Sequence, residues 1–145
     1  MIVSQILKSK STGGVFTLTS HANVAEAALI MSDKCIGALI ISDDGGATPA
    51  GILSERDIVR ELGKHGPSCM SSIVSDMMTK KLVTCGLSDA TDSVLAKMTE
   101  GRFRHMPVME CGEMVGLISI GDAVKARLLE LAAERDALTD MVMGH

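Results

Sequence analysis

The spacing of apolar residues alternates between the period of a strand and that of a helix. Short apolar runs at 15–18, 36–41 and 51–54 predict strands. A glycine-rich turn at 43–49 separates the last two, and polar residues from Ser54 onward open a second helix. The order is therefore strand, helix, strand, strand, helix. Between the first two strands, apolar residues recur at the spacing of an amphipathic helix, at Val24, Ala27, Ala28 and Met31.

The same order of elements returns in the second half of the chain. Residues 51–57 match residues 116–122 at an offset of 65, and residues 24–41 match residues 91–108 at an offset of 67. The difference of two residues falls in the turn between the last two strands, which is shorter in the second copy. Asn23 in the first copy and Asp89 in the second lie near the start of the predicted helix and are expected to cap it. The segment 63–68, rich in helix breakers, is the expected linker between the copies. A single copy would leave one apolar sheet face uncovered, so we expect two βαββα repeats to pack about a pseudo-two-fold axis in an α+β fold.

A long helix is predicted at the end of the chain. We accordingly place a first repeat at residues 1–66, a second at 67–130 and a C-terminal helical extension at 131–145. Such a helix reaches about 30 Å, further than a small repeat can cover, so part of its apolar edge is expected to pack on a second subunit of a homodimer. Arg135 interrupts the apolar stripe, which argues against a sustained coiled coil. The stripe follows a 4,3 spacing at Val124, Leu128, Leu131, Leu138 and Val142.

Composition excludes several classes of protein. A net charge of −4 gives no electrostatic reason to bind nucleic acid or an anionic membrane. No apolar run approaches the roughly 20 residues that span a bilayer, and no secretory signal is visible. The four cysteines form no C-x-x-C pair, which favours free thiols in a reducing compartment over a metal site. We expect a cytoplasmic protein that contacts neither nucleic acid nor membrane.

The candidate chemistry lies in a Ser-x-x-Asp pattern that occurs at the same place in both repeats, as Ser54 with Asp57 and as Ser119 with Asp122. This spacing at a helix start fits a variant of the capping box, in which the serine and the acidic residue satisfy backbone N–H groups. A carboxylate there also fits the two hydroxyls of a ribose, because it accepts hydrogen bonds from both. The two roles are compatible.

The doubled Gly-apolar-apolar-Ser-x-x-Asp, with Ile-Gly-Ala-Leu at 36–39 and Arg-His-Met-Pro-Val at 104–108, resembles the CBS domain, named for cystathionine β-synthase. The resemblance covers essentially the whole chain, and residues 119–127 look like those of bacterial stand-alone tandem CBS pairs. It implies two clefts between the repeats. Family members commonly hold AMP, ADP or ATP there, and in some cases NAD(H) or S-adenosylmethionine.

The resemblance also implies a set of nucleotide-binding residues. Asp57 and Asp122 would hold the ribose, with support from the hydroxyls of Ser54 and Ser119. Apart from the resemblance, Arg56 in one repeat, and Arg104 and His105 in the other, offer cationic donors for phosphate. Neighbouring strand residues face opposite sides, so Arg104 and His105 need not reach one phosphate, and a structural role for His105 stays open. The cationic pair makes the second cleft the better candidate for a phosphate-bearing ligand. The remaining cleft residues would be Thr17, Gly37, Ala38, Thr84, Met106 and Pro107.

Three functions remain open at this point. The leading one is a regulatory module that binds an adenine nucleotide, AMP before ATP or NAD, and signals to a partner protein; it needs no other cofactor. The second is a structural or protein-interaction scaffold without ligand. An enzyme ranks third, because no catalytic triad, metal cluster or carboxylate pair emerges from the spacing.

Overall fold

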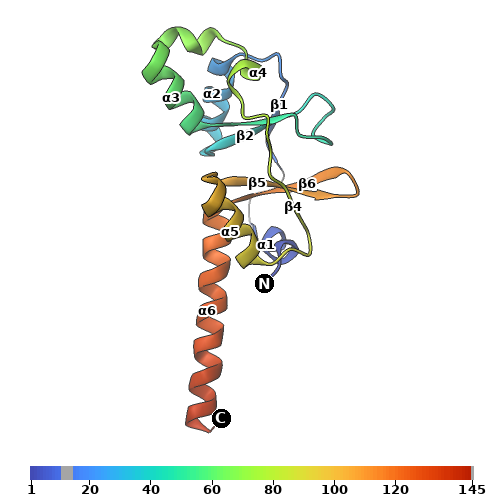
Figure 1. The fold of residues 1–145 in the computed structure, drawn as a ribbon, viewed down its shortest axis with the longest axis vertical. Coiled ribbons are helices and arrows are strands. Elements are labelled where there is room, and N and C mark those ends of the chain that lie inside the picture. Colours follow the sequence, from blue (N-terminus) through green and yellow to red (C-terminus); the bar gives the residue numbers. More distant parts are fainter. Residues whose placement is uncertain (11–14, 145) are drawn as a thin grey trace. The chain divides into compact units, whose positions relative to one another are not determined.

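The computed structural model describes residues 1–10 and 15–144 (Figure 1). His145, the last residue of the expected extension, lies outside the described residues. Two compact units are present, and we treat each by itself. The first unit comprises residues 15–83 and 109–116, and the second comprises residues 1–10, 84–108 and 117–144. The chain therefore passes between the units several times.

The first unit is a three-stranded sheet covered by helices. Strand β2 lies in the middle, parallel to β1 and antiparallel to β3. Its core includes Leu39, Ile41 and Leu53 from the sheet and Val24 from α2. Short α4 completes this core with Val74 and Met77. The elements are β1 (Thr17–Leu18), α2 (Val24–Lys34), β2 (Ala38–Ile41), β3 (Gly51–Ser54), α3 (Glu55–His65), the 3-10 helix η1 (Pro67–Ser71) and α4 (Val74–Met77).

The second unit repeats this plan with strand order β4-β5-β6. Its core joins Met106 and Ile118 from the sheet to Val94 and Met98 from α5. Residues 109–116, the far part of the β5–β6 hairpin, belong to the first unit, where the Met114 amide donates to the Ala47 carbonyl at 2.8 Å. The elements are α1 (Val3–Ser9), β4 (Cys85–Gly86), α5 (Thr91–Gly101), β5 (His105–Glu110), β6 (Glu113–Ser119) and α6 (Ile120–Met143).

The internal repeat is visible in the backbone of the two helix ends. Helices α2 and α5 both end at a residue in the left-handed region, Cys35 (φ 53°) and Arg102 (φ 56°). These positions are 67 residues apart, the offset found in the sequence. Such a residue turns the chain sharply at a helix end and lets its N–H reach back to the last carbonyls. In both repeats the sharp turn sends the chain into the strand that follows.

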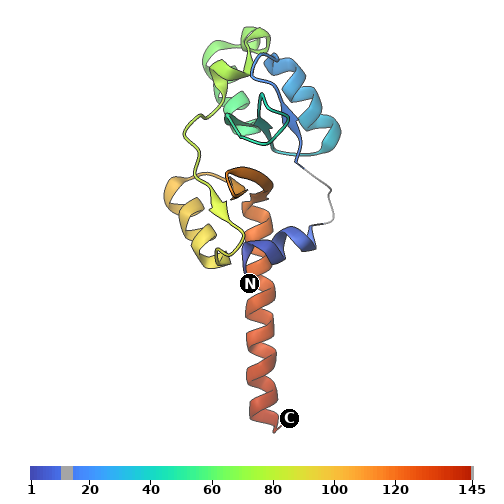
Figure 2. The ribbon, with the colours of Figure 1, turned by 90° about the vertical axis from the view of Figure 1, so that its right-hand side faces the viewer.

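The N-terminal helix α1 packs in the second unit, with Val3 and Ile6 fully buried in its core. Figure 2 shows α1 beside the start of α6. Thr91 at the start of α5 donates its Oγ1 hydrogen to the Met1 carbonyl at 2.9 Å. The mirrored element α4 packs in the first unit. Helix α1 belongs to the first repeat in sequence but packs in the unit that contains β4, β5 and β6. Helix α4 belongs to the second repeat but packs in the unit that contains β1, β2 and β3.

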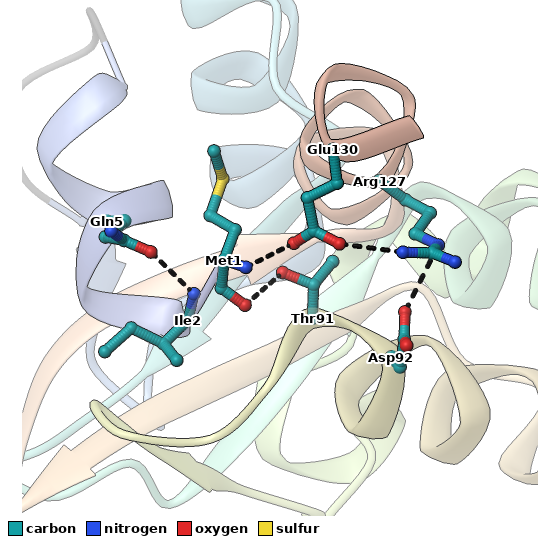
Figure 3. Close-up of polar contacts among 7 residues, drawn as sticks. All are labelled: Met1, Ile2, Gln5, Thr91, Asp92, Arg127 and Glu130. Atoms are coloured by element: carbon teal, nitrogen blue, oxygen red, sulfur yellow. Dashed lines mark hydrogen bonds and ion pairs between the residues drawn. The ribbon is translucent and has the colours of Figure 1, made fainter. Parts of the chain in front are cut away.

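Polar contacts tie α5 to α6 at the same place (Figure 3). Arg127 Nε lies 3.3 Å from Asp92 Oδ1, and Arg127 Nη1 lies 2.9 Å from Glu130 Oε2. Glu130 in turn pairs with the Met1 ammonium group at 2.6 Å. One arginine thus bridges two helices, and the carboxylate next to it holds the start of α1.

The structure confirms the predicted α+β fold with two repeats and a long C-terminal helix. The first strand of each repeat is shorter than expected, and the linker expected at 63–68 begins inside α3. Asn23 caps α2 as predicted, but Asp89 does not cap α5. Its carboxylate accepts from the Gly86 amide at 2.8 Å, and Ala90 takes the cap position. The repeat boundaries at 66/67 and 130/131 remain a prediction, because the units are defined by packing.

Candidate functional site

In the first unit, the strand pairing brings the start of β2 next to the start of α3. Ala38 lies opposite Ser54 in the β2–β3 ladder. The Gly37 carbonyl then accepts a hydrogen bond from the Glu55 amide at 2.9 Å. Because β3 runs directly into α3, the Ser-x-x-Asp segment is held against the strand that carries Gly37 and Ala38.

Both oxygens of the Asp57 carboxylate accept hydrogen bonds within its own unit. Oδ2 accepts from the Ser54 amide at 3.0 Å, while the Asp57 amide donates to Ser54 Oγ at 3.2 Å, which completes a capping box. Oδ1 lies 3.0 Å from Arg60 Nη2. The side chain is only 8% exposed. A ligand hydroxyl would therefore have to compete with Arg60 for this carboxylate.

The second unit repeats the backbone frame. The Ile120 amide donates to the Arg104 carbonyl at 2.8 Å, as Glu55 does to Gly37. Ser119 and Asp122 form the second capping box, with the Ser119 amide 2.9 Å from Asp122 Oδ2 and the Asp122 amide 3.1 Å from Ser119 Oγ. Both capping roles expected from the spacing are thus realised.

Asp122 differs from Asp57 in how its carboxylate is used. Lys10 Nζ lies 2.9 Å from Oδ2, the oxygen that already accepts from Ser119, and also donates to the Leu117 carbonyl at 2.8 Å. Within residues 1–10 and 15–144, Oδ1 of Asp122 has no hydrogen bond or ion pair. The side chain is 24% exposed. Among the described residues, Oδ1 of Asp122 therefore has its acceptor sites open, whereas each oxygen of Asp57 already accepts a hydrogen bond.

The remaining predicted residues separate into two sets, one in each unit. In the first unit, Thr17 and Arg56 are exposed; Thr17 lies beside Ile40 in the β1–β2 ladder, and Arg56 lies in the first turn of α3. In the second unit, Thr84 precedes β4 and is exposed, as is Arg104. On β5, His105 is half-buried, while Met106 and Pro107 are buried.

Buried Met106 contributes to the core of its unit. Pro107 accepts a weak contact from the Cys85 thiol, with Sγ 3.8 Å from the Pro107 carbonyl oxygen. Burial, followed by the charge of Asp89, raises the pKa of Cys85 to about 11. That thiol stays protonated at neutral pH and is a poor nucleophile.

Two functional neighbours were missed by the sequence analysis. Arg60 lies three residues after Asp57 on α3, a spacing at which helical side chains meet, so the sequence alone could have indicated this ion pair. Lys10 lies 112 positions before Asp122 in the chain, and no periodicity connects the two. Only the packing of α1 in the second unit explains how this lysine reaches the carboxylate.

The charge on Asp122 is stabilised by its neighbours. Burial alone would raise the pKa of this carboxyl, but hydrogen bonds from Lys10 and Ser119 and the positive charge of Lys10 outweigh burial and lower the pKa below its usual range. A lowered folded-state pKa contributes stability at pH values above the unfolded value, and this contribution is lost as pH falls through the folded value.

Replacing Lys10 with methionine is therefore expected to destabilise the protein by about 1 kcal/mol at pH 7. Without Lys10, burial of Asp122 is opposed mainly by Ser119, so the pKa of Asp122 rises. The stability difference from wild type should then shrink as pH falls, first through the raised pKa of the variant and then through the lowered pKa of wild type, below which Asp122 is protonated in both proteins. Urea unfolding between about pH 7 and about pH 2 measures this, with Lys8→Met on the exposed surface of α1 as control. A difference that is constant with pH would contradict the role given to Lys10.

The repeated frame defines a class of protein: tandem βαββα units in which a strand runs into a helix through Ser-x-x-Asp. A family model for the CBS domain matches residues 3–64 and 74–129. Those segments cover most of the chain. This chain belongs to the CBS domain family and is a tandem pair.

Relatives with the same tandem organisation extend over nearly the whole chain. The CBS domain-containing protein CBSX3, mitochondrial, of Arabidopsis thaliana is 33% identical over 148 residues, which cover 98% of this chain and 72% of that protein. A putative signal-transduction protein with CBS domains from Burkholderia ambifaria has a solved structure at 40% identity and a TM-score of 0.82, covering 89% of this chain and 95% of that one.

One solved relative carries a nucleotide. A CBS domain protein from Pyrobaculum aerophilum, complexed with AMP, is 26% identical with a TM-score of 0.77, covering 92% of this chain and 99% of that one.

Residues 1–10 and 15–144 lack two kinds of feature. None of the helices there combines the length and apolar character needed to cross a membrane. Within the same residues, His, Cys, Asp and Glu side chains do not gather in threes in a way that could hold a metal ion.

Proposed function

We propose that this chain is a regulatory sensor that binds an adenine nucleotide, AMP first, at the site built around Asp122. The observation that supports the proposal most is Oδ1 of Asp122, which accepts no hydrogen bond from the described residues, on a charged, partly exposed side chain held at a helix start. The AMP complex of a relative with the same tandem organisation supports the ligand class. ADP, ATP and NAD(H) share the adenosine group and compete as candidates.

The chemistry of the proposed contacts follows from the residues. Asp122 Oδ1 accepts from a ribose hydroxyl, which an ionised carboxylate does more strongly than a neutral group. Exposed Arg104 supplies donors for phosphate. His105, half-buried at the start of β5, is a further proposed contact, and so are Thr84 and Ser119. The chain has no Trp or Tyr, so the adenine ring would lie against aliphatic side chains.

The output of the sensor is a change in the chain's own arrangement. A nucleotide shifts a conformational equilibrium only through different affinities for the two arrangements. We propose that a partner protein reads this shift, that the chain works as a homodimer in the cytoplasm, and that it performs no catalysis.

A ligand-free scaffold is the second candidate, and one observation favours it for the first repeat. The two carboxylate oxygens of Asp57 accept hydrogen bonds from Ser54 and Arg60, and the side chain is almost fully buried. On this basis the proposed contacts at Thr17, Gly37, Ala38, Ser54 and Arg56 form the weaker site. We propose that the two sites are unequal and that the Asp122 site is occupied first.

Thermal unfolding with AMP, ADP, ATP, NAD, NADH and S-adenosylmethionine tests the proposal on protein stripped of bound ligand. A ligand at about 100 times its dissociation constant should add about 2.7 kcal/mol to the free energy of unfolding. For a chain of this size, that raises the unfolding temperature by several degrees.

Asp122→Asn should remove the nucleotide-induced shift while keeping an oxygen that can accept from the Ser119 amide. Asp57→Asn is the matched control, since it alters the equivalent capping box but is expected to retain the shift. No shift with any compound at millimolar concentration, in folded wild-type protein, would reject the sensor in favour of the scaffold.

A further inference from the structure

The outer part of helix α6 presents an apolar stripe that its own unit does not cover. Figures 1 and 2 show this part of α6 running clear of α1, α5 and the sheet of the second unit. At 1.5 Å per residue, the 24-residue helix is about 36 Å long. The exposed fractions along the stripe are 44% for Val124, 62% for Leu128, 45% for Leu131, 62% for Leu138 and 85% for Val142.

The stripe has the spacing of a helix that packs along another helix. Its members alternate by four and three residues, and Arg135 occupies the one polar position in the series. Between the side chains lies an open hollow, lined among others by Leu131, Leu138 and Val142. Hollows of this kind receive the projecting side chains of a facing helix.

From this pattern we propose that α6 pairs with α6 of a second copy of this chain, in antiparallel orientation about a two-fold axis at the level of Ala133. The interface is independent of nucleotide binding and holds even if the sensor function fails. In this register the stripe is complementary to itself. The facing residues are Val124 with Val142, Leu128 with Leu138, and Leu131 with Arg135, each pair occurring twice.

The charges on α6 select the antiparallel orientation over the parallel one. A parallel pair would place Arg135 directly against Arg135 of the other copy, inside the seam. The antiparallel pair places Arg135 against Leu131 of the second copy, where its alkyl stem packs and its guanidinium reaches Glu134 of that copy. Arg135, which argued against a sustained coiled coil, is thereby accommodated in a short antiparallel pair.

The distribution of charge along α6 is a second reason to expect the antiparallel orientation. Residues 133–143 carry three carboxylates and one arginine, whereas residues 123–129 carry Lys125 and Arg127 and no carboxylate. A parallel pair would set the two acidic halves side by side. The antiparallel pair separates them, brings Lys125 to the level of Asp140 of the second copy, and opposes the two helix dipoles.

The first test is the molar mass in solution, measured by light scattering after size-exclusion chromatography. Wild type should be a dimer. Leu138→Glu should weaken dimerisation by at least about 100-fold, since each dimer would bury two unpaired carboxylates. Ala133→Glu is the matched control, because it adds the same charge on the opposite side of the helix, and it should remain a dimer. A monomeric wild type, or a dimer that survives Leu138→Glu, overturns the proposal.

Disulfide trapping tests the orientation in a background of Cys35→Ser and Cys111→Ser, which removes the two exposed native thiols. A mixture of Leu128→Cys chains and size-tagged Leu138→Cys chains should form a cross-linked heterodimer on mild oxidation. Neither variant alone should cross-link, because like positions lie about 15 Å apart along an antiparallel pair and a disulfide needs Cα atoms within about 7 Å. Cross-linking of either variant with itself, or none in the mixture, overturns the antiparallel pair.

Discussion

Replacing Ile6 with alanine is expected to lower the free energy of unfolding by about 2–5 kcal/mol. Ile6 is 2% exposed and lies in the core of the second unit, where the other buried residues, apart from Val3, come from Cys85 and beyond in the chain. Truncation removes three methyl or methylene groups and leaves a cavity between α1 and the helices that cover the sheet. Few single changes in a chain of this size cost more.

Denaturant unfolding measures the effect, with Lys8→Ala as control. Lys8 lies on the exposed side of the same helix, so its replacement should change stability by less than about 0.5 kcal/mol. An Ile6→Ala protein as stable as the control would mean that α1 does not belong to the core of the second unit.

Gly51→Ala is expected to destabilise the protein by about 1–3 kcal/mol. A Cβ atom at this position would lie 2.5 Å from Met78 Sδ and 3.0 Å from the Thr79 carbonyl oxygen. The methionine is flexible, but Thr79 is fixed by two backbone hydrogen bonds with Ile52, of 3.0 and 2.9 Å. The added methyl group therefore pushes against a backbone that can move only by losing that bridge.

Gly63→Ala is the matched control for this change, with the opposite sign expected. Gly63 lies inside α3, and a Cβ there would meet nothing within 4 Å. Alanine at an exposed helical position should stabilise the protein by about 0.5–1 kcal/mol. The two variants, compared by thermal unfolding, should move the midpoint in opposite directions. A Gly51→Ala variant that is as stable as wild type would show that β3 and the segment after α4 are not in contact.

The repeated elements were predictable because their signal is periodic and occurs twice. Helices α2 and α5, the strand pairs and both capping boxes rest on patterns of four or more residues at two matching places. The short helices α1 and α4 were missed as elements, since seven and four residues are too few to show a helical period. Their matching sequences were visible, but their exchange between the units is a property of packing alone.

The candidate site was predictable only in part, for a related reason. Ser54, Asp57, Ser119 and Asp122 form local capping boxes, so spacing revealed them. The difference between the two carboxylates depends on Arg60 and Lys10. Asp89 was expected to cap α5 because it precedes the helix, yet its carboxylate accepts a hydrogen bond from the Gly86 amide instead. Competition between two nearby N–H groups cannot be decided from spacing.

The exchange of the short helices has a consequence for the order of synthesis. When α1 leaves the ribosome, none of its core partners exists; Val94 and Met98 follow about 90 residues later, and Ala123 and Ala126 later still. At typical elongation rates of about 5–20 residues per second, Val3 and Ile6 remain unpacked for some seconds before the core residues that cover them have been synthesised. The second unit can close only when nearly the whole chain has been made, so a nascent chain stalled in the second repeat keeps an apolar helix exposed to chaperones and proteases.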